Sequence, residues 1–155
     1  FVTVGDSGTI LTSSDGTSWV NRTSEVSSTL YGVTYGNSTF VTVGDNGTIL
    51  TSSNGTSWTS RTSNSSNNLY EVVYGNSTFL TMGASGTILT SSDGTSWTSR
   101  ISSASDPLQG AIYGKNAYVV VVGTLGTVLT SSDLTNWTSR TSNTSNNLVE
   151  VTYKE

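Results

Sequence analysis

Two glutamates, Glu71 and Glu150, hold the positions in this 155-residue chain that most suggest chemistry. They occupy matching places in the segments LYEVVY and LVEVTY, whereas Gly32 and Gly110 stand there in the two related segments. Two carboxylates brought close together raise one another's pKa or hold a cation between them. We therefore consider this pair a candidate cation site, and the alternative is that both side chains are simply solvated.

Composition excludes several other kinds of chemistry. The chain has no His and no Cys, so it lacks the commonest metal ligand, the usual general base, a thiol nucleophile and any disulfide. It has six Lys and Arg residues and a net charge of -4, which gives no basic surface for a phosphate backbone. No apolar run approaches the roughly 18 residues of a membrane helix. We expect no cofactor, no nucleic-acid partner and no membrane insertion.

The positions of these residues depend on a sequence repeat. The stretch TSSDGTSW at 12–19 returns as TSSNGTSW, TSSDGTSW and TSSDLTNW, beginning at residues 51, 90 and 130. The period is about 39 residues, and the chain divides as a single repeat domain into units 1–39, 40–78, 79–117 and 118–155. Periods of this size are typical of stacked or radially arranged supersecondary units.

Each unit has the period-2 pattern of β-structure. Short runs rich in Val, Ile, Thr, Tyr and Phe alternate with turn residues, and no helical periodicity occurs. The dipeptides Asp15-Gly16 and Asn54-Gly55 predict tight hairpin turns with two positive φ angles. The single extra residue of the last unit, within YVVVVG at 118–123, predicts a β-bulge. The sequence therefore predicts an all-β fold, a β-propeller of four approximately 39-residue, four-stranded blades.

The two ends of the chain suggest how such a ring closes. The sequence begins with FVTVG, which matches the second strand of a blade, and it ends with LVEVTY, which matches a first strand. We expect the C-terminal strand to pair with residues 1–5 and so to complete the N-terminal blade. In that closed ring, Glu71 and Glu150 would face each other across the central channel.

The repeated stretch resembles a known motif. TSSDGTSW is similar to an Asp-box, the S-x-D-x-G-x-x-W hairpin of bacterial neuraminidase-type (BNR) repeats, but is one residue shorter between the acidic residue and the Trp. The wider unit resembles propeller blades of bacterial secreted and surface proteins. The resemblance implies a structural role, in which the acidic or amide side chain closes the turn and the Trp packs between blades. The residues concerned are Asp15, Trp19, Asn54, Trp58, Asp93, Trp97, Asp133 and Trp137.

An arginine follows three residues after each of these tryptophans, at positions 22, 61, 100 and 140. Sialidases, which carry Asp-boxes, hold a substrate carboxylate with an arginine cluster. The arginines of this chain instead repeat at one position of the outermost strand. We therefore expect each to stack on the neighbouring Trp or to bind the Asp turn, and we predict no catalytic residues.

These observations favour a non-catalytic structural or interaction module that is extracellular or on the cell surface. Its partner would be another copy of itself, assembled into oligomers or filaments by exchange of the terminal strand, or other surface proteins. A lectin-like propeller that binds glycans through aromatic side chains is the main alternative. A sialidase-like or lyase enzyme is more remote, as is a chaperone-like role suggested by a resemblance to photosystem-assembly propellers. Candidate glycosylation sites in turns are Asn37, Asn46, Asn54 and Asn76.

Overall fold

The protein is described here by a computed structural model that covers residues 1–154 and all their side chains except that of Ala117. In this part of the chain, fifteen short strands form four antiparallel sheets, each of which is one blade. Blade 1 contains β1 (Val2–Val4), β2 (Ile10–Thr12) and β3 (Val20–Arg22). Blade 2 contains β4 (Leu30–Gly36), β5 (Thr39–Gly44), β6 (Ile49–Ser52) and β7 (Thr59–Arg61). Blade 3 contains β8 (Leu69–Gly75), β9 (Thr78–Gly83), β10 (Ile88–Ser91) and β11 (Thr98–Arg100). Blade 4 contains β12 (Leu108–Tyr113), β13 (Val119–Gly123), β14 (Val128–Ser131) and β15 (Thr138–Ser139).

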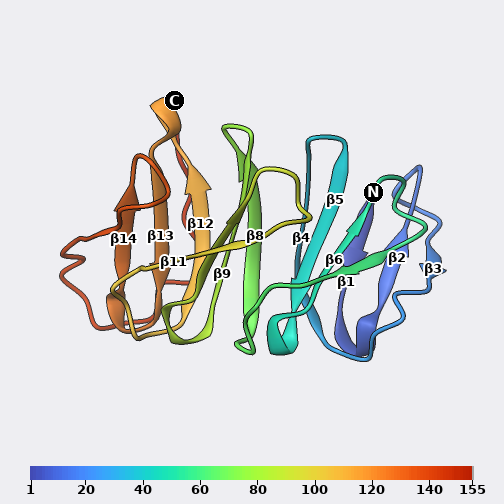
Figure 1. The fold of residues 1–155 in the computed structure, drawn as a ribbon, viewed down its shortest axis with the longest axis horizontal. Coiled ribbons are helices and arrows are strands. Elements are labelled where there is room, and N and C mark those ends of the chain that lie inside the picture. The colour runs from blue at the N-terminus through green and yellow to red at the C-terminus, as the bar shows by residue number, and fades with distance from the viewer. Residues whose placement is uncertain (155) are drawn as a thin grey trace.

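The predicted all-β architecture of four propeller blades is confirmed. Within each blade the strands pair in sequence order, as in β4-β5-β6-β7. The blades follow one another in a row, with the N-terminus at one end and the C-terminus at the other (Figure 1). Each sequence repeat therefore supplies the last three strands of one blade and the first strand of the next.

Glycines fix the turn between the second and third strand of each blade. These turns are the 3-10 segments η1 (Asp6–Gly8), η2 (Asp45–Gly47), η3 (Ala84–Gly86) and η5 (Thr124–Gly126). In η2, Asn46 has φ 53° and Gly47 has φ 70°. A Cβ atom on Gly47 would lie 2.0 Å from the carbonyl oxygen of Ser65 in the connection to the next blade. Both the left-handed backbone and this close approach require glycine there.

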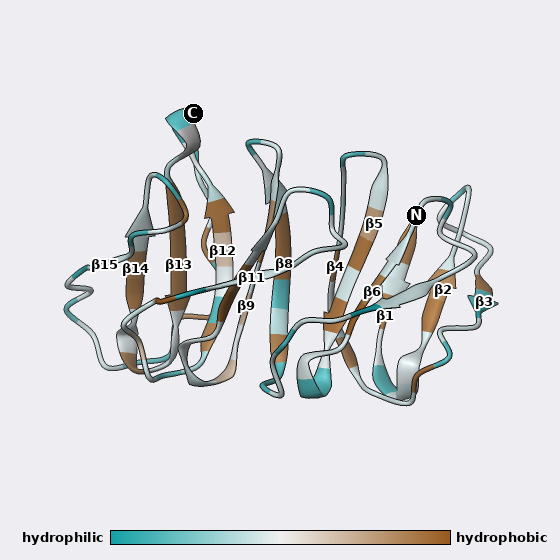
Figure 2. Cartoon of the chain, viewed as in Figure 1, coloured by the Kyte–Doolittle hydropathy of each residue, from teal (hydrophilic) through white to brown (hydrophobic). Residues whose placement is uncertain are grey.

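The core lies between successive blades. Hydrophobic residues lie along the inner strands (Figure 2), and their side chains pack against those of the neighbouring sheet. In one cluster Phe79 and Leu89 of blade 3 pack with Val41 and Val43 of blade 2. A blade therefore buries its faces only where another blade covers them, as the nearest-neighbour stability of repeat proteins requires.

The predicted β-bulge in the last unit is wrong. The extra residue lies in the β12–β13 turn, where the 3-10 segment η4 (Lys115–Ala117) takes the place of a shorter turn. Strand β13 then pairs in continuous register, with Val119 opposite Ser131 as Phe79 is opposite Ser91 in blade 3. A turn absorbs an added residue at little cost, whereas an added residue inside the strand would reverse the inward and outward side chains.

The predicted pairing of the C-terminal strand with the N-terminal blade does not form. Among residues 1–154, β1 pairs only with β2, and residues 148–153 are in no sheet. These residues instead lie beside β12, because a Cβ atom on Gly110 would be 3.0 Å from the Cα of Glu150. The corresponding distance between blades 2 and 3, from Gly32 to the Cα of Glu71, is 3.1 Å. The terminal segment thus lies at the same spacing from β12 as β8 lies from β4. The two ends of the chain remain at opposite ends of the row (Figure 1).

Candidate functional site

The acidic and amide side chains of the four repeated hairpins accept hydrogen bonds from their own turns. The Asp93 carboxylate accepts backbone N–H bonds from Thr95 at 2.7 Å and Ser96 at 2.9 Å, and a hydroxyl bond from Ser91 at 3.0 Å. These donors hold the pKa of Asp93 below its usual range. Asn54 makes the same backbone bonds through its amide oxygen, at 2.8 and 3.0 Å. A charge is therefore not needed for the turn, and these residues serve local structure.

The hairpins differ from the tight turns that the sequence predicted. Strand pairing resumes only at Val20 opposite Thr12, so seven residues form the first of these loops. Gly16 and Gly55 have positive φ angles, whereas Asp15 and Asn54 do not. The turn needs only one residue with a positive φ angle, because the acidic or amide side chain closes it by accepting hydrogen bonds from the following backbone N–H groups.

The tryptophans are buried to very different degrees along the row. Trp58 and Trp97 are 9% and 7% exposed, whereas Trp19 is 42% exposed. The hairpin of blade 2 packs on blade 1, since a Cβ atom on Gly55 would lie 3.5 Å from Val2. The hairpin that carries Trp19 belongs to the first blade and has no preceding blade beneath it, so the N-terminal face of the row exposes this ring.

Blade 4 shows what the loss of the motif glycine changes. Leu134 stands in its place and has a φ of 60°, which is uncommon for this residue type. The indole Nε1 of Trp97 donates to the carbonyl of Gly94 at 2.9 Å, but the buried Nε1 of Trp137 has no hydrogen-bond partner. The indole bond to the motif glycine is therefore present in blades 1 to 3 and absent in blade 4, and the structural role of these residues stays a prediction.

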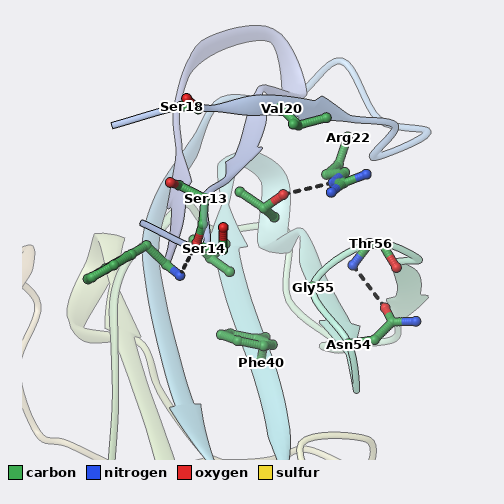
Figure 3. Close-up of a pocket in the computed structure, with 12 residues that line it drawn as sticks. Ser13, Ser14, Ser18, Val20, Arg22, Phe40, Asn54, Gly55 and Thr56 are labelled. Atoms are coloured by element: carbon green, nitrogen blue, oxygen red, sulfur yellow. Dashed lines mark hydrogen bonds between the residues drawn. The ribbon is translucent and has the colours of Figure 1, made fainter. Parts of the chain in front are cut away.

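The four arginines bind threonines on the adjacent strand. Arg22 donates from Nε to the Thr12 hydroxyl at 2.8 Å, a bond drawn in Figure 3. The same bond recurs from Arg61, Arg100 and Arg140 to Thr51, Thr90 and Thr130 at 2.8 to 2.9 Å. These bonds go neither to the Trp ring nor to the Asp turn. The expected partners of the arginines are therefore corrected to the threonines of the adjacent strand. The arginines lie one per blade and do not converge on one pocket.

The two glutamates lie along the row rather than across a channel. Glu71 is on β8 and Glu150 is in the terminal segment, with Gly110 of β12 between them in the order of strands. Burial raises the pKa of Glu71, and the negative charge of Glu150 adds to this effect. Each carboxylate accepts a bond from the next backbone N–H, at Val72 and Val151.

The alternation of glycine and glutamate has a packing explanation. Gly32 and Gly110 allow the following strand to approach closely, as the distances of 3.1 and 3.0 Å given above indicate. A Cβ atom on Gly110 would collide with the carbonyl oxygen of Val149 at 2.7 Å, and one on Gly32 would make tight backbone contacts with the next strand. The two-unit pattern thus follows from the spacing of inner strands, and a cation at Glu71 and Glu150 stays a prediction.

Blade 1 has an unpaired strand edge. Phe1 and Ser13 exchange backbone hydrogen bonds, so the polar groups of Phe1 point toward β2. Because these directions alternate along a strand, the N–H and C=O groups of Val2 and Val4 point to the opposite edge. In blades 2 to 4 that edge is occupied by a first strand, and in blade 1 it carries none among the described residues.

The other end of the row is hollowed. A cavity of about 500 Å³ lies there, lined mainly by apolar groups of Ile112, Val120, Val151, Tyr118 and Tyr153. A second cavity, of about 390 Å³, lies between blades 1 and 2 (Figure 3). Its lining mixes apolar side chains with Arg22 and with serine, threonine and asparagine side chains, and the apolar residues are Phe1, Val2, Val20 and Phe40.

The aromatic side chains differ in how exposed they are, whereas the candidate glycosylation asparagines are alike. Tyr31 and Tyr35 are exposed, whereas Tyr74 packs against the core. The four candidate glycosylation sites, Asn37, Asn46, Asn54 and Asn76, are all exposed. Glycan binding and glycosylation both stay predictions. In the described part of the chain no helix is long and apolar enough to cross a membrane.

The fold and its repeated hairpins define a β-propeller-type protein built as a row of blades. Among solved structures, the chain is similar to YCF48 bound to a D1 peptide, with 20% identity over 96% of this chain and a TM-score of 0.73. It is also similar to YCF48 from Cyanidioschyzon merolae, with 14% identity over 90% of the chain and a TM-score of 0.65. In both cases it spans about half, 52%, of the other chain. No protein-family model and no curated protein sequence matches it.

Sequence reasoning missed the residues that set the distance between blades. Gly36 is one of them, because a Cβ atom there would lie 2.1 Å from the ring of Tyr74. Gly75 stands in the same relation to Tyr113, at 2.4 Å. The signal was present in the sequence, since a Gly follows each first-strand Tyr of the first three units.

Proposed function

We propose that this chain is a non-catalytic interaction module that binds protein partners through the two ends of its row of blades, with a second copy of itself as the partner. One observation carries the proposal: among the described residues the outer edge of β1 has no strand beside it, and residues 148–153 repeat the sequence of a first strand but are in no sheet. A head-to-tail contact between two copies would pair these two segments. The terminal segment need not leave its own chain to do so.

The register of the intact blades gives the pairing that such a contact uses. In blade 2, Thr34 lies opposite Val41 and Gly32 lies opposite Val43. The equivalent pairs between copies are Thr152 with Val2 and Glu150 with Val4. The free N–H and C=O groups of Val2 and Val4 then receive a strand, as in β-strand addition.

The proposal includes protein binding outside the cell. The similar YCF48 structure contains a bound D1 peptide, which supports a role for such blades in protein interaction. The chain is rich in Ser, Thr and Asn and only 10% of its residues are charged, a composition that favours an extracellular module. Two copies that join at both ends close a ring, and a join that does not close produces a filament.

A proline at the free edge tests the strand pairing. Val2→Pro removes an N–H that has no partner in the single chain, so the fold is retained while the incoming strand loses a bond. Static light scattering over a range of concentrations should show association of the wild-type chain and weaker association of this variant. Val2→Thr keeps the N–H and serves as the control. Equal association of all three chains would contradict the proposal.

A further inference from the structure

A groove lies between the outer strand of blade 3 and the hairpin of blade 4. Its volume is about 490 Å³, which falls within the roughly 300 to 1,000 Å³ of ligand-binding pockets. The side chains that matter for its chemistry are Arg100 and Ile101 of blade 3 and Thr135, Asn136 and Trp137 of blade 4. Both walls belong to consecutive blades, so the groove is formed inside the row and away from its two end faces.

The chain departs from its own repeat on both sides of this groove. Ile101 stands where the other three units have a threonine, and Asn136 stands where they have a serine. Leu134, in the same hairpin as Asn136, replaces the motif glycine. Ile101 is 85% exposed, the most exposed large apolar side chain that the structure describes. One exposed apolar side chain is ordinary by itself, but here it borders a groove whose other wall carries an indole ring.

That indole also carries a buried donor without an acceptor. In blades 1 to 3 the Nε1 of the hairpin Trp donates to the carbonyl of the motif glycine at 2.9 to 3.2 Å. The Nε1 of Trp137 is buried and has no partner in the part of the chain that the structure describes. Buried polar groups are normally hydrogen-bonded. An acceptor that reaches this N–H from the groove therefore gains a bond that the chain itself does not supply.

Arg100 supplies further donors from the opposite wall. Its Nε is held by the Thr90 hydroxyl at 2.8 Å, which fixes the guanidinium at the groove. In blade 4, the Nη2 of the corresponding Arg140 donates to the hydroxyl of Tyr118, but unit 3 has Phe79 in place of that tyrosine. The Phe ring offers no acceptor hydroxyl. Among the described residues, the Nη groups of Arg100 therefore lack the partner that those of Arg140 have.

The hairpin of blade 4 supplies acceptors. The Nδ2 of Asn136 donates to the Asp133 carboxylate at 2.8 Å, which leaves the amide oxygen Oδ1 as the other end of this side chain. The Thr135 hydroxyl donates to the Asp133 carbonyl at 3.3 Å, so it too is left as an acceptor. The groove thus presents donors and acceptors together. A hydroxyl group matches both, because it donates and accepts, whereas a carboxylate only accepts.

We propose that the groove between blades 3 and 4 is a binding site for an uncharged carbohydrate. The apolar face of a sugar ring lies between Ile101 and Trp137, and its hydroxyl groups bond to Arg100 and Asn136. An acidic sugar fits less well, because its carboxylate would meet the oxygen acceptors of the hairpin and a chain with a net charge of -4. The site goes beyond the proposed self-association and uses neither end of the row.

The indole N–H groups report directly on this site. The chain has 4 Trp residues, which give separate indole resonances in a proton–nitrogen correlation spectrum, and Trp137→Phe identifies the resonance of blade 4. The probes are the neutral trisaccharides of glucose, mannose and N-acetylglucosamine. Titration with at least one of them should shift the Trp137 resonance and leave those of Trp19, Trp58 and Trp97 in place.

A matched pair of arginine variants separates binding from folding. Arg100→Gln should weaken sugar binding about tenfold to a hundredfold, because hydrogen bonds from a charged donor contribute factors of this size. Arg61→Gln is the control, since Arg61 makes the same 2.8 Å bond to a threonine, Thr51, but belongs to blade 2. Both variants lose equal strand contacts, so a purely structural role of Arg100 would give equal effects.

Restoring the repeat residue tests the apolar wall. Ile101→Thr installs the residue that the other three units carry, and the high exposure of Ile101 means that the fold is retained. This variant should weaken sugar binding roughly fivefold, because covering part of an Ile side chain contributes about that factor. Melting temperatures of all variants verify that they are folded.

The outcomes decide the proposal in both directions. A selective shift of the Trp137 resonance, with weaker binding in Arg100→Gln but not in Arg61→Gln, supports the carbohydrate site. A shift of a different indole, equal weakening by the two arginine variants, or no shift with any of the three sugars up to the millimolar range would overturn it. Binding of acidic sugars alone, or of an apolar peptide in place of the sugars, would also overturn it, because the groove would then recognise another class of ligand.

Discussion

At the scale of single residues, the acidic and amide side chains of the repeated hairpins act by accepting hydrogen bonds from backbone donors within one hairpin. The geometry that Asp93 and Asn54 share, with N–H bonds of 2.7 to 3.0 Å, shows that the acceptor oxygen is the essential part. The indole N–H adds one further bond where the motif glycine is present. Blade 4 lacks this bond, so the chain provides an internal comparison for its contribution to stability.

Replacing the indole by a phenyl ring should therefore cost more in blade 3 than in blade 4. Trp97→Phe removes the Nε1 bond to Gly94, whereas Trp137→Phe removes a buried donor that has no partner. We expect Trp97→Phe to lower the free energy of unfolding by about 1 kcal/mol more than Trp137→Phe. Urea unfolding of both variants measures the difference, and equal losses would mean that the bond contributes nothing.

The lowered pKa values of the hairpin carboxylates predict a loss of stability in acid. Backbone N–H bonds from the residues two and three positions further along the chain lower the pKa of both Asp15 and Asp93. The stabilisation is therefore complete above the unfolded-state pKa of about 3.9 and is lost as the pH falls below it. The double variant Asp15→Asn with Asp93→Asn should show a flatter decline in melting temperature between about pH 4 and pH 2.

The comparison with the wild-type chain isolates this effect from Glu71. Burial raises the pKa of Glu71, so its contribution has the opposite sign and decreases as the pH rises through the raised value. Both chains retain Glu71, and its contribution cancels between them. A double variant with the same acid dependence as the wild type would show that the Asp-box carboxylates are not responsible.

At the scale of the elements, glycines at the ends of first strands set the spacing of blades. A Cβ on Gly36 would lie 2.1 Å from the ring of Tyr74, whereas one on Gly114 would lie 3.4 Å from the nearest atom, the Tyr118 carbonyl oxygen. Gly36→Ala should therefore destabilise the fold by roughly 1 to 3 kcal/mol, as overpacking does. Gly114→Ala should be neutral or slightly stabilising, and chemical denaturation of a dilute sample compares the two.

The blades themselves were predictable from the sequence because each is defined locally. Period-2 patterning and turn glycines recur with the repeat, so strands and hairpins could be assigned without knowing their neighbours. The placement of the extra residue was not predictable in this way, because YVVVVG reads as strand throughout and the turn before it contains no added glycine. The hairpin type was also missed, since an Asx side chain substitutes for a left-handed residue.

The relation between blades was the least predictable part of the fold. Whether residues 148–153 close the ring depends on the angle between successive blades, and that angle arises from contacts such as Tyr74 on Gly36. These contacts join residues 38 positions apart and leave no local pattern. For the same reason the arginine partners were missed, because Thr51 and Arg61 meet only across a strand pair.

At the scale of the whole molecule, the row of blades is unequal at its two ends. Among the described residues, the first blade presents Phe1, Trp19 and an unpaired edge of β1, and the last blade presents an apolar cavity next to residues 148–153. The proposed head-to-tail association would bring these two faces together, in a closed ring or in a filament.

The native mass of the wild-type chain in solution tests this account most directly. A single chain has a mass of 16.2 kDa. Sedimentation equilibrium at increasing concentration should show a rise to a multiple of this mass, either a closed dimer or longer assemblies. A single species of 16.2 kDa at every concentration up to the millimolar range would contradict the account.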